Sequence, residues 1–164
     1  MRAKWRALPR EEAFLFNPAF LAVLLARACE GYEAEKESPM PITLGFVSLS
    51  LALHRPTRLR FPRAVSTNLL RWTLDNPDLL ATAPTRANAL VPLLRNGLLF
   101  ALANGVCSLA SHASISVAPD ADLPSARGIT NEVVECQRSA QFVGRWFGRA
   151  GSQETVLAVL GIRP

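Results

Sequence analysis

The feature that most constrains the fold is a regular apolar stripe near the end of the chain. Within 129–150, apolar residues recur every three or four positions, at Val133, Cys136, Ala140, Val143 and Phe147. This spacing follows the turn of an α-helix and places all five side chains on one face. Gly151 comes directly after the stripe, and glycine is a common residue at the end of a helix. We therefore predict a long helix over 129–150 with one face buried in a core.

An Asn-Pro pair predicts the first helix of the chain. Asn17 can cap a helix, and Pro18 is tolerated in its first turn. Gly31 is expected to end this helix and to begin a charged loop that closes at Pro41. The next segment, 42–53, is largely apolar, and its period fits a strand as well as a helix. We favour the helix because Pro41 is well placed to open one.

Prolines and polar residues delimit the middle of the chain. Two prolines within 54–63 predict a structured loop without a regular element. One helix is predicted over 64–75, and another over 85–104 with a kink or restart at Pro92. Residues 106–118 then alternate between apolar and polar types around a short polar turn. This alternation predicts a β-hairpin.

These segments together predict a single domain, 1–164, that is mainly α with a small β-hairpin (α+β). A length of 164 residues fits one domain, and 49% hydrophobic residues suffice for a compact helical core. Residues 1–12 are expected to form a polar N-terminal arm. A helical core followed by a hairpin is also how winged-helix modules are built, so a winged-helix-like arrangement is one hypothesis for the fold.

Cysteine usage and the N-terminal sequence indicate a location. Cys29, Cys107 and Cys136 are scattered and odd in number, which argues for a reducing compartment and against a disulfide framework. Basic residues before the apolar run 13–26 loosely resemble a signal peptide, but two glutamates and the Asn-Pro pair break the pattern. No run reaches the ~18 apolar residues that a membrane-spanning helix needs. We expect a cytoplasmic protein that does not contact a membrane.

The usual motifs for catalysis are missing from the sequence. It contains no Gly-rich loop ending in Lys-Ser/Thr, no Gly-x-Ser-x-Gly turn and no Cys or His pair at zinc spacing. Glu132 and Glu135 are spaced as a carboxylate pair, yet they lie where the dipole of the predicted long helix favours acids. We expect no enzyme, no cofactor and no metal. An enzyme with an unrecognised site is the alternative.

Arginines form one dense constellation in the middle of the chain. Four of them fall within nine residues, two prolines stiffen the segment, and a fifth arginine follows with no acid in between. Guanidinium groups bind phosphates and carboxylates, and a stiff loop loses less entropy on binding. A solvated basic loop is the alternative. The predicted contacts for DNA or a partner are Arg55, Arg58, Arg60, Arg63, Arg71 and His54.

Four segments along nearly the whole chain carry a family resemblance. They are Leu-Phe-Asn-Pro-Ala-Phe-Leu-Ala at 15–22, Leu-Ala-Leu-His-Arg-Pro-Thr-Arg at 51–58, Gly-Arg-Trp-Phe at 144–147 and Leu-Gly-Ile-Arg-Pro at 160–164. In this order they resemble the middle components of bacterial three-component ABC systems. Lamassu-type anti-phage and anti-plasmid systems contain such a subunit.

The resemblance implies a small non-enzymatic adaptor. It would bridge an SMC-like ATPase, expected as a dimer, and an effector that is often a nuclease, and it would help to hold the effector inactive until foreign DNA is sensed. ATP and Mg would be bound by the partner ATPase, and DNA would be contacted through the complex. Trp5 in the polar arm is a candidate for the partner interface because of its amphipathic ring. Asn17 and Phe20, in the first matching segment, are the other candidates.

A free-standing winged-helix DNA-binding regulator is the competing hypothesis. It requires a recognition helix with exposed polar side chains just before the hairpin. Residues 90–102 occupy that position and are mostly apolar, which disfavours the regulator.

Overall fold

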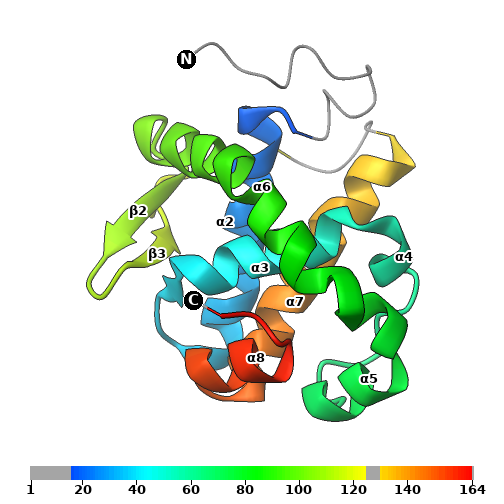
Figure 1. Cartoon of the computed structure of the whole chain (residues 1–164). Coiled ribbons are helices and arrows are strands. Elements are labelled where there is room, and N and C mark those ends of the chain that lie inside the picture. The colour runs from blue at the N-terminus through cyan, green and yellow to red at the C-terminus, as the bar shows by residue number, and fades with distance from the viewer. Residues whose placement is uncertain (1–15, 125–129, 164) are drawn as a thin grey trace.

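The protein is mainly α-helical with a small antiparallel sheet, as the sequence predicts (Figure 1). A computed structural model describes residues 16–124 and 130–163. Its elements, in chain order, are α2 (Pro18–Lys36), β1 (Met40–Pro41), α3 (Ile42–Leu53), α4 (Arg55–Arg58), α5 (Leu69–Asp75), α6 (Pro77–Ala103), β2 (Cys107–Ala110), β3 (Ser114–Val117), α7 (Asn131–Ala150) and α8 (Gln153–Val159).

The core is built around the contact between α2 and α7. The predicted long helix is confirmed, and each residue of its apolar stripe is buried. The facing side of α2 contributes buried leucines, and α3 and α6 pack onto this pair. Burial of one face by neighbouring helices provides most of the stability of such helices. The cysteines Cys29, Cys107 and Cys136 are all buried as free thiols.

Gly31 does not end α2, which corrects the prediction made from the sequence. The helix continues to Lys36, and Glu37 in the left-handed conformation closes it with an N–H bond to the carbonyl of Glu33. Gly31 is instead buried where α7 crosses, and a Cβ added there would lie 2.1 Å from the carbonyl oxygen of Gln141. The glycine allows close helix contact, so the expected charged loop shrinks to the short segment 37–39.

One further prediction is confirmed, and two others differ from the structure. Residues 42–53 form the helix that was favoured over a strand. The helix predicted from residue 64 begins only at Leu69, because the Asn68 side chain accepts the Arg71 N–H and caps it there. The segment 54–63 is not a loop throughout: α4 forms one helical turn, with Pro56 in the position where a helix tolerates proline.

Helix α6 is longer than predicted. It begins at Pro77 rather than at residue 85 and contains both Pro84 and Pro92. Each proline removes one helical hydrogen bond, but buried residues along the helix, such as Leu79 and Leu94, hold it against the core. In the part of the chain that the structure describes, no helix is long and apolar enough to cross a lipid bilayer.

The predicted hairpin is confirmed and has an additional partner strand. Strands β2 and β3 pair antiparallel, with Leu109 opposite Ile115. At the tip, His112 and Ala113 both have positive φ angles, as tight hairpin turns require. Strand β1 pairs with the other edge of β3, where Met40 lies opposite Ile115. This two-residue strand is too short to produce a periodic signal in the sequence.

Candidate interaction surfaces

Arg58, one of the predicted contact residues, is part of the fold. Only 4% of its side chain is exposed. One guanidinium nitrogen donates to the carbonyl of Ala52 near the end of α3 at 2.7 Å, and another forms an ion pair with Glu132 in the first turn of α7. The side chain thereby joins α3, α4 and α7. Its guanidinium is turned inward and offers little surface to DNA or to a partner.

Arg60 and Arg71 lie at the surface in ion pairs. Arg60 donates to both carboxylate oxygens of Asp78 at 2.8 Å, and this bond lowers the pKa of Asp78. Arg71 pairs with Asp75 at 3.1 Å, one turn away on the same helix. Exposed ion pairs contribute little to stability. Both guanidinium groups can therefore exchange their intramolecular carboxylate for one on a partner at small cost.

Arg55 and Arg63 are exposed and have no ion-pair partner among residues 16–124 and 130–163. His54 is half-buried beside them, with its Nδ1 2.7 Å from the hydroxyl of Thr57. Burial lowers the pKa of His54, and the positive charges of Arg86 and Arg58 lower it further. His54 is therefore neutral at pH 7. Of the five arginines in the predicted constellation, Arg58 is therefore buried and two are exposed in ion pairs. The other two, Arg55 and Arg63, are exposed without an ion-pair partner in the part of the chain that the structure describes.

Large leucines are exposed along the same segment. Leu59, Leu70 and Leu74 are 73%, 51% and 69% exposed. We use the name basic–apolar face for these leucines and the exposed arginines near them in the sequence, namely Arg55, Leu59, Arg60, Arg63, Leu70, Arg71 and Leu74. Exposed apolar side chains accompanied by arginine are typical of surfaces that bind other proteins.

These leucines are not among the contact residues predicted from the sequence. The helical period of α5 carries the signal that was overlooked. Leu69, Trp72 and Thr73 occupy the buried side of α5, and Leu70 and Leu74 follow the same spacing on the opposite side.

An aromatic cluster holds this segment from beneath. Trp72 and Trp146 meet edge to face with ring centroids 5.2 Å apart, and Phe61 packs against both. The indole of Trp72 donates to the carbonyl of Arg60 at 2.8 Å, and that of Trp146 to the carbonyl of Thr67 at 2.7 Å. Both tryptophans are buried. They fix the backbone that carries the exposed arginines, which lowers the entropy cost of binding there.

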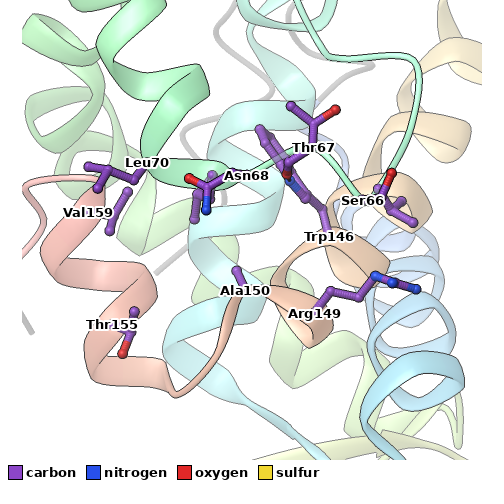
Figure 2. Close-up of a pocket in the computed structure, with 11 residues that line it drawn as sticks. Ser66, Thr67, Asn68, Leu70, Trp146, Arg149, Ala150, Thr155 and Val159 are labelled. Atoms are coloured by element: carbon purple, nitrogen blue, oxygen red, sulfur yellow. Dashed lines mark hydrogen bonds between the residues drawn. The ribbon is translucent and has the colours of Figure 1, made fainter.

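A hollow of about 440 Å³ opens beside Trp146, between the turn 65–68, the end of α7 and α8 (Figure 2). Its polar groups are largely engaged within the fold: Asn68 caps α5, and Arg149 pairs with Glu35 at 3.2 Å. The lining supplies hydroxyl groups, including those of Ser66 and Thr155, but no carboxylate or imidazole. A hydroxyl nucleophile needs an adjacent general base to activate it, and the lining of this hollow supplies no carboxylate or imidazole for that role.

Three residues near the N-terminus were predicted to lie at a partner interface, and the structure describes two of them, Asn17 and Phe20. Asn17 is half-buried and caps α2, since its side chain accepts the N–H of Ala19 at 2.9 Å. Phe20 is buried and belongs to the hydrophobic core. Trp5 and the predicted arm 1–12 lie outside the described residues. No group of three His, Cys, Asp or Glu side chains that could hold a metal ion occurs within the described residues.

The fold and its exposed features define a small helical domain whose candidate sites are surfaces for contact with other macromolecules. A family model for Middle Component 3 of the ABC-three component (ABC-3C) systems matches residues 5–164, and the chain belongs to this family. The resemblance to middle components of three-component systems is thereby confirmed. In the comparisons with curated proteins and with solved structures, nothing matches the chain.

Proposed function

We propose that this chain is a non-catalytic adaptor that joins an SMC-like ATPase to an effector, often a nuclease, in an anti-phage or anti-plasmid complex of the Lamassu type. Membership of the middle-component family supports a role in a multi-subunit system. In this proposal the partner ATPase binds ATP and Mg, and the adaptor acts in the cytoplasm by binding alone. It holds the effector inactive until the complex senses foreign DNA.

The observation that carries the proposal is the basic–apolar face. Burial of a leucine side chain against a partner contributes roughly 1.5–3 kcal/mol before the costs of association. Three exposed leucines on the segment 59–74 therefore offer a substantial part of the free energy of a micromolar complex, about 8 kcal/mol. The neighbouring arginines supply orientation and a preference for acidic surfaces.

A protein partner fits this face better than DNA. Phosphate groups would engage Arg55 and Arg63, yet they would leave the leucines exposed to water. An acidic protein surface with apolar residues would satisfy both groups at once. We therefore assign the face to the ATPase or the effector, with DNA binding as the alternative outcome of the test.

The test is co-purification of the tagged chain expressed with its flanking genes. The informative variant is Arg55→Glu with Arg63→Glu, which leaves the internal Arg58 intact. The matched control is Arg138→Glu, an exposed arginine on α7 outside the face. We expect the wild type and the control to retain the ATPase and the effector, and the double variant to lose at least one of them. A second variant, Leu70→Ser with Leu74→Ser, tests the apolar part.

Other outcomes separate the alternatives. If the double variant assembles normally but loses DNA, the face binds phosphate. If the wild-type chain purifies alone under all conditions, the adaptor proposal is wrong.

The competing winged-helix regulator predicts specific binding of a duplex by the isolated chain. Helix α6 precedes the hairpin, and its last turns expose Leu99 and Phe100, which are poorly suited to reading base edges.

A further inference from the structure

A second groove lies away from the basic–apolar face, between α3, α6 and the C-terminal tail. Its volume is about 380 Å³. Figure 1 shows the tail ending beside α3, in the region that α6 crosses. Along α6 the lining residues fall on one side of the helix at three- and four-residue spacing. The residues that line the groove include Ile42, Phe46, Asn88, Val91, Arg95, Leu98 and Arg163.

The floor of the groove is apolar and already formed. Ile42, Phe46 and Leu98 are half-buried and pack against the main core. Val91 lies between Asn88 and Arg95 along α6, lines the same groove and is also half-buried. Because the floor residues rest on the core, an apolar side chain that enters the groove needs little rearrangement of the protein.

The rim is positively charged. Arg95 and Arg163 are both exposed, the lining contains no acid, and neither arginine forms an ion pair within the described residues. A ligand that carries carboxylates beside apolar side chains is therefore expected to bind this groove most tightly.

We propose that this groove binds an acidic amphipathic helix of another component of the three-component system. From Asn88 to Leu98 the groove side of α6 is roughly 15 Å long, which matches about three turns of an α-helix. Apolar residues of the incoming helix would cover the floor, and its carboxylates would contact Arg95 and Arg163, as in helix-in-groove recognition. This inference rests on the proposed adaptor function and names the chemistry of one partner.

The experiment uses the complex formed with the flanking components. A photo-crosslinking amino acid, p-benzoylphenylalanine, is placed at Asn88 on the groove rim, and at Arg138 as a control position. The crosslinked segment is then mapped by mass spectrometry. We expect the Asn88 crosslink to fall on a segment of another component with acids and apolar residues at three- and four-residue spacing.

Charge reversal provides the second measurement. Arg95→Glu with Arg163→Glu is expected to weaken retention of that component about tenfold or more, whereas Arg138→Glu leaves it unchanged. Thermal unfolding confirms that each variant is folded, and Arg95→Gln with Arg163→Gln replaces the reversal if it is not. Opposite charge reversal in the mapped segment should restore binding.

The outcomes distinguish this inference from the function on which it rests. If the complex assembles and Asn88 crosslinks only to a second copy of this chain, to nucleic acid or to nothing, the groove proposal is wrong and the adaptor function stands. If the arginine variants assemble like the wild type, the charge assignment fails with the same consequence. If the wild type forms no complex, both proposals fail.

Discussion

Gly144 of α7 lies directly against the carbonyl of Ala28 in α2, where a Cβ would be only 2.0 Å from the oxygen. Gly31 makes the reciprocal approach from α2, against the carbonyl of Gln141. The two central helices therefore meet backbone to backbone. Their contact also supports α3 and α6, which pack onto the same pair.

Substitution of Gly144 by Ala is expected to destabilise the protein by about 3 kcal/mol, the upper end for overpacking, because rigid backbone lies in the way. The free energy of unfolding in urea measures the loss. Gly105→Ala is the control: it has a positive φ but nothing within 4 Å, so only backbone strain of about 1 kcal/mol is expected. Equal losses in the two variants would contradict the close contact.

Replacement of Arg58 by Met is expected to cost about 2–4 kcal/mol, because it leaves the carbonyl of Ala52 and the carboxylate of Glu132 without their donor. Glu132 is partly exposed and can recruit water, so the lower half of that range is favoured. Arg58→Lys should restore little, since one ammonium group does not reproduce the two-sided guanidinium contact. A double-mutant cycle with Glu132→Gln measures the coupling, and additive losses would refute it.

Replacement of Trp146 by Phe is expected to loosen the turn at 65–68 more than the rest of the molecule. The phenyl ring keeps much of the aromatic packing but cannot donate to the carbonyl of Thr67, a loss of about 1–2 kcal/mol. Hydrogen exchange should quicken around this turn and at the start of α5. Trp72→Phe, which loses the bond to Arg60, should act further towards α4. Uniform acceleration along the chain would argue against a local role.

Stability is expected to fall as the pH drops from 7.5 to about 5.5, in part through His54. The pKa of His54 is lower in the folded protein than in the unfolded chain. As the pH falls through the ordinary pKa of histidine, the unfolded chain therefore binds a proton before the folded protein does, and this favours unfolding. The contribution of neutral His54 to stability is fully present at pH values above its pKa in the unfolded chain. It is lost as the pH falls towards its pKa in the folded protein. Unfolding midpoints at several pH values measure the slope. A His54→Gln variant should be less sensitive in this window, and an unchanged slope would rule out His54 as a cause.

Local chemistry in the sequence determined where several elements begin and which faces are buried. Asn17 and Ser152 cap helices through their own side chains, and the stripe from Val133 to Phe147 defined the buried face of α7. The alternation around residue 112 determined the hairpin. These features depend on residues within one or two turns of each other, so they are readable without knowledge of the fold.

Tertiary structure decided what depends on residues far apart in the chain. Gly31 could end a helix or allow another to approach, and only the position of α7 selects the second role. In the sequence, Arg58 cannot be distinguished from the other arginines of its cluster. In the structure it is buried because it pairs with Glu132, which is 74 residues away in the chain. The exposure of Leu70 and Leu74 and the groove beside Arg95 also depend on how elements far apart in the sequence pack together. Spacing along the chain describes one helix at a time, whereas a surface is formed by several elements together.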